Sequence, residues 1–401
     1  MNAEAPACVL VTEPTWGGVL HAARSLGSMG VPVYVATLGA GSSVFRRSRW
    51  VRAAADFHSD SDLVVGDILS WLGRTLVGGG PIPVLALSDR TAELLNAARG
   101  EIPDKYRPVL PSVEILEPLL TKSDAAAVAV AAGLRVPEWV GVASADDVAA
   151  ITQLKFPVVV RPEASTTSGG EASKVELLGD PVVAAARIGE LVGHGARLVV
   201  SEFVEAPVEA VEFGVVWRSL DGTSTAVCTG RKRRQAGPDG GVMAWGEAVD
   251  LPDVRQGAID FLDASGFRGV GGIEFIRADG KLWFIEFNPR LEAIHFLASR
   301  AGVDTVLMAY RDAAFDERPA CVPTQVAATG WVGSAWAQRL IAEPGEWRHA
   351  LRDRVAFARS PNRVRAVMGR RDPAATLALA AYFGGRAWTR LRRLAGRAPA
   401  L

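Results

Sequence analysis

The stretch from Gly269 to Arg290, GVGGIEFIRADGKLWFIEFNPR, constrains the fold of this chain more than any other. It contains two runs rich in β-branched and aromatic residues, Gly271–Ile276 and Leu282–Phe287. An Asp-Gly pair lies between them, and Asp-Gly between two such runs is a strong signal for a tight turn. The stretch therefore predicts a β-hairpin.

Three polar side chains on this hairpin indicate a ligand site. Glu286 and Asn288 are two residues apart, so they point to the same face of a strand. A three-residue loop at Asp279–Lys281 would place Glu274 opposite Glu286 on that face, whereas a two-residue turn would place them on opposite faces. On one face, this set of oxygens suits Mg²⁺, which bridges carboxylates to substrate phosphates. The alternative is an ordinary half-exposed hairpin with surface acids.

Length and composition favour a folded protein of two or three domains, because 401 residues exceed one ordinary core. The N-terminal MNAEAPACVLV lacks a basic region, so we expect no signal peptide. No apolar run approaches the roughly 18 residues of a membrane span. Cys8, Cys228 and Cys321 have no metal or redox spacing, which is typical of reduced thiols. We therefore expect a cytoplasmic protein.

The N-terminal part predicts a βαβ unit, with a strand at Cys8–Thr12, a helix at Val19–Met29 and a strand at Val31–Thr37. Open α/β sheets bind ligands in the loops at the carboxyl ends of their strands. The loops at Glu13–Gly18 and Ser88–Arg90 follow such strands and are therefore candidates for ligand contact, although each could be a plain strand-to-helix turn. No G-x-G-x-x-G is present, so a dinucleotide fingerprint is excluded.

Three later segments bring cations or further strands. Lys122 precedes an alanine-rich helix, and the strand Phe156–Pro162 delivers Arg161 to a proline-terminated edge. The run Ala164–Gly170 follows, and Leu198–Val204 is another buried-type strand. Alone, each segment has an ordinary structural explanation, and their order along the chain is what relates them to the hairpin.

The hairpin and the helix after it, IEFNPRLEAIHFLASRAGVD, resemble the end of the ATP-grasp domain. The resemblance is greatest to the branch of carbamoyl-phosphate synthetase and biotin carboxylase, and it covers roughly residues 5–320. It implies a mixed α/β and α+β fold, with a two-lobed ATP-grasp domain. The expected parts are a Rossmann-like pre-ATP-grasp domain at 1–118, lobes at 119–198 and 199–325, and a basic, mostly helical C-terminal extension at 326–401.

The resemblance also implies a nucleotide-binding site for ATP. Lys122 and Arg161 would contact its phosphates, and Arg290 would contact the transferred phosphoryl group; these three would be the catalytic residues. Main-chain groups of the hinge would bind adenine, and the carboxylate of Glu209 would bind the ribose. The remaining expected nucleotide contacts are Ser168, Gly169, Gly170, Glu202, Phe203 and Val204.

The same resemblance implies a metal site that holds Mg²⁺, with Mn²⁺ as an alternative. Its expected ligands are Glu274, Glu286 and Asn288.

Four consecutive cations at 231–234, RKRR, are typical of nucleic-acid patches when taken alone. The run is short and isolated in a chain with no net charge, so we expect no nucleic-acid partner. The resemblance implies instead that one of Arg231, Arg233 and Arg234 contacts phosphate, and it leaves open which one.

From Trp331 onward the chain has fourteen arginines, no lysine and four acidic residues, a net charge of +10. Pro373–Arg397 could form a basic amphipathic helix. Such helices sometimes bind anionic membranes, but docking on the parent domain is the favoured interpretation. The resemblance is also compatible with a homodimer.

The implied activity is that of an ATP-dependent carboxylate–amine ligase acting on small molecules. It would phosphorylate a carboxylate to an acyl phosphate and join that to an amine, releasing ADP and phosphate. The alternative is a non-catalytic nucleotide-binding regulatory or scaffold protein, because the loop after Gly170 lacks a further glycine and carries Glu171. A biotin-dependent carboxylase is disfavoured, since the chain has no Met-Lys-Met motif.

Overall fold

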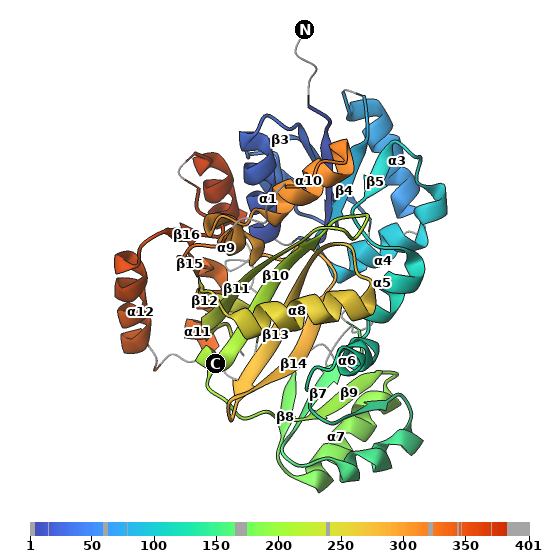
Figure 1. Cartoon of the computed structure of the whole chain (residues 1–401), viewed down its shortest axis with the longest axis vertical. Helices are drawn as coiled ribbons and strands as arrows, with labels where there is room; N and C mark the ends of the chain where they lie inside the picture. Colours follow the sequence, from blue (N-terminus) through green and yellow to red (C-terminus); the bar gives the residue numbers. More distant parts are fainter. Residues whose placement is uncertain are drawn as a thin grey trace, which may run out of the picture.

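The protein folds into three β-sheets surrounded by helices, as Figure 1 shows for the computed structural model. The N-terminal domain, the large seven-stranded sheet and a smaller four-stranded sheet lie one after another along the long axis of the molecule. The structure describes residues 5–14, 16–58, 63–77, 79–164, 175–237, 241–319, 324–342, 345, 347–369 and 371–382.

The N-terminal domain is a parallel five-stranded sheet of order β3-β2-β1-β4-β5. From β1 the chain adds β2 and β3 on one side of the sheet and then β4 and β5 on the other. The crevice between β1 and β4 is the position where open α/β sheets bind ligands. The Rossmann-like prediction is thereby confirmed. The strands are β1 (Cys8–Thr12), β2 (Val33–Leu38), β3 (Val51–Phe57), β4 (Ile82–Ala86) and β5 (Tyr106–Pro108). The helices are α1 (Trp16–Ser28), α2 (Ser42–Phe45), α3 (Val64–Thr75), α4 (Asp89–Ala97), the 3-10 turn η1 (Arg99–Glu101) and α5 (Val113–Leu119).

The small lobe is an antiparallel sheet of order β6-β9-β7-β8, covered on one face by α7 (Pro181–Gly193). Asp180 caps α7 by accepting hydrogen bonds from the N–H groups of Val182 and Val183. Valine, leucine and isoleucine side chains from the sheet and α7 form a separate core. The other elements are α6 (Lys122–Ala131), β6 (Trp139–Val142), η2 (Ala145–Gln153), β7 (Val158–Pro162), β8 (Glu176–Leu178) and β9 (Leu198–Glu202).

The large lobe is a seven-stranded sheet of order β14-β13-β10-β11-β12-β15-β16. One face packs on α8 (Pro252–Ser265), where the ring of Phe261 lies 5.3 Å from Phe284 and 4.7 Å from Phe287. The strands are β10 (Val211–Arg218), β11 (Thr225–Gln235), β12 (Met243–Ala248), β13 (Gly269–Ala278), β14 (Lys281–Asn288), β15 (Ala328–Trp331) and β16 (Arg363–Arg365). Shorter elements are η4 (Val208–Ala210), α9 (His295–Arg300) and α10 (Thr305–Phe315).

The hairpin β13–β14 combines a two-residue turn with a β-bulge. Ala278 pairs with Lys281, and Asp279 and Gly280 have φ values of 50° and 70°, so the two-residue turn is the alternative that the chain adopts. A two-residue turn alone would place the two glutamates on opposite faces. The register shifts after Glu274, however, and Glu274 pairs directly with Glu286. The extra residue in β14 therefore restores the shared face.

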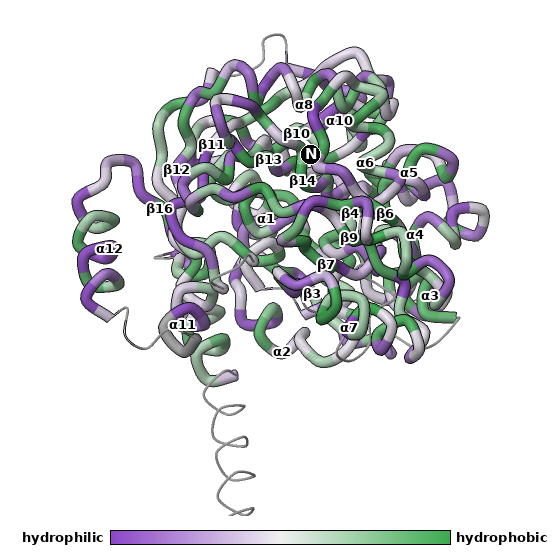
Figure 2. The backbone as a smooth tube through the Cα atoms, turned by 90° about the horizontal axis from the view of Figure 1, so that it is seen from below, coloured by the Kyte–Doolittle hydropathy of each residue, from purple (hydrophilic) through white to green (hydrophobic). Residues whose placement is uncertain are grey.

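The C-terminal segment continues the large sheet. β15 pairs antiparallel with β12, and β16 pairs parallel with β15, so two strands of the expected extension join the seven-stranded sheet. α11 (Gly333–Ala342) and α12 (Trp347–Arg359) lie beside this edge, and α12 stands at the periphery of the molecule (Figure 2). Among the described residues, no helix is long and apolar enough to cross a membrane.

Candidate active site

The candidate site lies where the carboxyl ends of β1 and β4 meet the segment after β14. The Nε of Arg290 donates a hydrogen bond to Asp89 at 2.6 Å, and its Nη2 donates to the same carboxylate at 3.4 Å. The helix α1 begins at Trp16, earlier than predicted, and its first turn lies against the same segment, because a Cβ on Gly18 would be 3.5 Å from Leu291. Both segments predicted to contact ligands therefore reach the end of the hairpin through the first turns of α1 and α4.

Arg290 is surrounded by acceptors. Besides Asp89, it donates to the Oδ1 of Asn288 at 3.4 Å and lies 3.6 Å from a carboxylate oxygen of Glu292. Burial alone would lower the pKa of Arg290, but Asp89, Glu292 and Glu286 outweigh burial and raise it. Its guanidinium is thus permanently charged and held in one orientation.

Lys232, in β11, is a site residue that was not predicted from the sequence. Its side chain is only 6% exposed, and Nζ lies 2.7 Å from Glu274 and 3.3 Å from the carbonyl oxygen of Gly241. Burial alone would lower the pKa of Lys232, but the attraction of Glu274, Glu286 and Glu292 raises it. Lys232 therefore supplies a fixed positive charge directly beside the expected metal ligand.

The other cations of the RKRR run point elsewhere. Arg231 and Arg233 both form ion pairs with Glu247, at 3.8 and 2.8 Å. Arg234 contacts Glu209 and Asp353 instead. The run lies within a strand, so neighbouring side chains alternate between its faces. The period-two pattern of β11 separates Lys232 from Arg231 and Arg233 but not from Arg234, whose different direction accompanies a register shift between Lys232 and Arg234.

Two cations of the small lobe face Glu286. Lys122 begins α6 and Arg161 lies in β7, from which its Nη1 donates to the carbonyl oxygen of Ile285 at 3.3 Å. Burial lowers the pKa of each, mutual repulsion lowers that of Lys122 further, and Glu286 and Glu163 oppose these shifts. The buried Nε of Arg161 has no hydrogen-bond partner among the described residues. A polyanion such as a nucleotide phosphate fits this arrangement.

The expected metal ligands lie side by side. Glu274 and Glu286 are paired across the hairpin, and Nδ2 of Asn288 donates to Glu286 at 3.3 Å. Burial, with repulsion from Glu286, raises the pKa of Glu274, while Lys232 opposes the shift. Two carboxylates and an amide oxygen are hard ligands that suit Mg²⁺. Within the described ranges, no group of three or more His, Cys, Asp or Glu side chains is gathered for a metal.

The hinge residues are partly engaged with the protein. The N–H groups of Glu202 and Phe203 donate to the carbonyl oxygens of Glu138 and Pro157, at 2.9 and 3.0 Å. Val204 is different, because its main chain makes no hydrogen bond with the described part of the chain. The side chain of Glu209 is 40% exposed and accepts a hydrogen bond from Arg234. Ser168, Gly169 and Gly170 lie outside the described residues.

Glu292 was also missed in the sequence, because nothing in its spacing separates it from a surface acid. Burial, with repulsion from Glu274, Glu286 and Asp89, raises the pKa of Glu292 to about 8, although Arg290 opposes the shift.

His295 is fully buried, and its Nδ1 lies 2.7 Å from the hydroxyl of Thr305. His295 is therefore a core residue.

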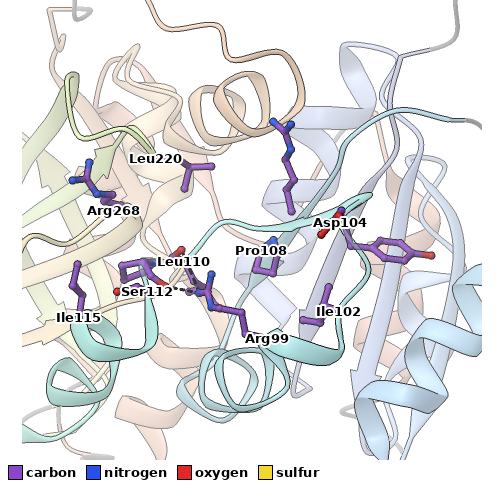
Figure 3. Close-up of a pocket in the computed structure, with 12 residues that line it drawn as sticks. Arg99, Ile102, Asp104, Pro108, Leu110, Ser112, Ile115, Leu220 and Arg268 are labelled. Carbon is purple, nitrogen blue, oxygen red and sulfur yellow. Dashed lines mark hydrogen bonds between the residues drawn. The ribbon is translucent and has the colours of Figure 1, made fainter.

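A cavity of about 590 Å³ between the N-terminal domain and the large lobe is separate from this site. Figure 3 shows Arg99 and Asp104 on the side of the N-terminal domain, with Leu220 and Arg268 on the other wall. None of the predicted site residues lines it. Arg99 donates to main-chain carbonyls, including that of Pro111, so its charge is used within the linker to the small lobe.

Comparison with known proteins agrees with this geometry. Residues 121–317 match the family model described as carbamoyl-phosphate synthase L chain, ATP binding domain. A segment of 149 residues is 31% identical to the formate-dependent phosphoribosylglycinamide formyltransferase of Burkholderia lata, covering 35% of this chain and 36% of that protein. The chain thus spans little more than a third of the length of this curated relative.

Solved structures share the fold over most of the chain. N5-carboxyaminoimidazole synthetase from Staphylococcus aureus, complexed with ADP, is 14% identical with a TM-score of 0.63, covering 86% of this chain and 87% of that one. Biotin carboxylase from Campylobacter jejuni is 17% identical with a TM-score of 0.61, covering 81% and 74%. Residues 121–317 therefore resemble the ATP binding domain of the carbamoyl-phosphate synthase L chain in sequence, and the chain as a whole shares its fold with these solved structures.

Proposed function

We propose that the protein is an ADP-forming carboxylate–amine ligase. The observation that carries this proposal is the meeting of three cations, Lys122, Arg161 and Arg290, with the paired carboxylates of Glu274 and Glu286. Phosphoryl transfer requires positioning and charge neutralisation rather than covalent work by the protein. The site provides both.

The nucleotide would lie between the two lobes. The free main-chain groups of Val204 would bind the adenine edge, and the exposed oxygen of Glu209 would accept from the ribose hydroxyls. Lys122 and Arg161 would hold the phosphates, where the unpaired Nε of Arg161 gains an acceptor. The loop at 168–170 is proposed as a further phosphate contact.

Glu274, Glu286 and Asn288 would hold Mg²⁺, or Mn²⁺ in its place. When bound, the metal neutralises charge on the phosphate oxygens. When no metal is bound, the charge of Lys232 neutralises Glu274 and reduces the repulsion between the carboxylates of Glu274 and Glu286.

The reaction proceeds in two displacements. A carboxylate oxygen of the substrate attacks the γ-phosphorus, and the bond to ADP breaks. The amine nitrogen then attacks the acyl carbon, loses a proton, and expels phosphate. Arg290, fixed by Asp89, stabilises first the transferred phosphoryl group and then the oxyanion of the tetrahedral intermediate.

The residues above favour turnover over the non-catalytic scaffold, because a scaffold requires no oriented arginine beyond the phosphates. The substrates are proposed to be a small carboxylate and a small amine. A cytoplasmic location is inferred, since Cys8 and Cys228 are free, buried thiols and ATP is available there. The homodimer and membrane contact stay predictions, and residues 383–397 of the expected basic helix lie outside the described residues.

A phosphate-release assay tests the proposal. Purified protein is incubated with ATP, Mg²⁺ and pooled small carboxylates and amines, and each pool is then omitted in turn. We expect release that requires the carboxylate pool and forms an amide product in the presence of the amine. Tight ATP binding with no release under any combination would support the scaffold alternative instead.

A further inference from the structure

A chain of three charged side chains connects the C-terminal segment to the nucleotide site. Asp353 of α12 accepts from the Nε and Nη2 of Arg234, at 2.8 and 3.1 Å. The Nη1 of the same arginine donates to Oε1 of Glu209 at 2.7 Å. One guanidinium therefore joins the hinge, strand β11 and helix α12.

Asp353 is held firmly in place. It is 7% exposed, and α12 packs on the sheet through Phe357, whose ring lies 5.2 Å from Trp331. A buried carboxylate requires a paired cation, and a two-point contact with arginine fixes orientation as well as charge. The geometry thus determines which edge of Arg234 faces Glu209.

We propose that Asp353 is a positioning residue for nucleotide binding, acting through Arg234 on Glu209. With its Nε and Nη2 edge taken by Asp353, Arg234 offers Glu209 a single N–H group. The second oxygen of Glu209 then stays available to the sugar hydroxyls of the nucleotide. Without Asp353, the two-point edge of Arg234 would turn to Glu209 and occupy both oxygens.

This inference rests on the proposed nucleotide pose and goes beyond it, because α12 lies outside the matched residues 121–317. A segment outside the matched residues would thus set how well ATP binds. The affected contact is with the sugar, so the effect should depend on the sugar hydroxyls and not on the phosphates.

Calorimetric binding of ATP and of 2′,3′-dideoxy-ATP to full-length protein tests this dependence. In Asp353→Asn we expect ATP to bind about tenfold more weakly, the loss of roughly one charge-assisted hydrogen bond. Dideoxy-ATP, which lacks both hydroxyls, should bind equally to both proteins. An unchanged ratio of the two affinities would overturn the inference.

Asp372→Asn is the matched control. Asp372 is another buried acid of the same segment, but it accepts from Arg24 and Ser48 of the N-terminal domain. This variant should lower the melting temperature and leave the affinity ratio unchanged. A ratio that falls equally in both variants would indicate a purely structural role for Asp353 and contradict the inference.

Two further variants keep the test decisive. If Asp353→Asn does not fold, Arg234→Lys removes the planar fork and should lower the same ratio. On a Glu209→Gln background, Asp353→Asn should cause no further loss of ATP affinity. An additive loss would contradict the proposed action of Asp353 through Arg234 on Glu209.

The binding test can be separated from the test of the ligase. Binding needs no turnover, so protein that binds ATP without releasing phosphate refutes the ligase alone. Turnover together with an unchanged ratio of the ATP and dideoxy-ATP affinities refutes the role of Asp353 alone. Wild-type protein that binds no ATP contradicts both proposals.

Discussion

The two edges of the seven-stranded sheet are built differently and have different roles. At one edge, β13 and β14 concentrate the acids of the candidate site within a single hairpin. At the other, β15 and β16 bring a segment from far along the chain, whose acid Asp353 meets Arg234 in the middle of the sheet. The first edge is formed by residues close together in the sequence and carries the proposed chemistry. The second edge is formed by contacts between distant parts of the chain and positions other residues. Substitutions at each edge should therefore have different consequences.

Glu286→Gln should have the largest effect. It removes a charge from the proposed metal site while keeping the shape, so we expect turnover to fall by about 10³-fold with little change in melting temperature. Phosphate release measures it. Glu247→Gln serves as the control, because Glu247 pairs with Arg231 and Arg233 away from the site. Equal activity of the two variants would contradict the metal assignment.

Lys232→Met should affect both stability and turnover. It leaves Glu274 buried beside Glu286 without its cation, which costs about 3 kcal/mol of unfolding free energy. Added Mg²⁺ with ADP should restore part of this loss, because the metal replaces the missing charge. Thermal unfolding with and without Mg²⁺ and ADP measures both effects. Destabilisation that ligand does not reduce would argue against a metal beside Glu274.

Glu292 should make stability depend on pH. Its pKa of about 8 in the folded protein exceeds the roughly 4.3 of an unfolded glutamate, so the folded state keeps a proton that the unfolded state releases. This contribution is complete below about pH 4 and is lost as pH rises towards 8. Relative to Glu292→Gln, the wild type should lose on the order of 3 kcal/mol between pH 5 and 8. Parallel stability curves for the two proteins would refute this.

Asp372→Asn should have the smallest effect on activity. Asp372 accepts from Arg24, from the hydroxyl of Ser48 and from the N–H of Arg49, so its loss should cost about 1–3 kcal/mol of stability. Because these contacts include none of the hairpin acids, turnover at 25 °C should remain within about twofold. A large loss of turnover would extend the active site to the second edge and weaken the contrast between the edges.

Patterns within single elements were sufficient to predict much of the fold. The strand at Cys8–Thr12 and the hairpin around Asp279 and Gly280 follow from apolar runs and turn chemistry. The bulge after Glu274 was not predictable, because it depends on how β14 fits against β13 and not on any turn signal. The sequence alone therefore could not decide whether Glu274 and Glu286 share one face of the hairpin.

Charge patterns were the least informative part of the sequence. Lys232 lies among three arginines in the sequence, and its separation from Arg234 depends on a register shift within β11 that no sequence pattern indicates. The arginine-rich C-terminal segment was expected to be mostly helical, but it also supplies β15 and β16. β15 pairs with β12, about 80 residues earlier in the chain, and β16 then pairs with β15, so tertiary pairing decides their structure. Long-range contacts of this kind leave no local signature.

The most direct test of the central claim is the position of a metal in crystals grown with ADP and Mn²⁺. Anomalous scattering locates Mn²⁺ without reference to the protein atoms. We expect a peak between the carboxylates of Glu274 and Glu286, with Asn288 alongside and the phosphates facing Lys122 and Arg161. Bound ADP with Mn²⁺ elsewhere, and Glu274 still paired with Lys232 alone, would contradict the account.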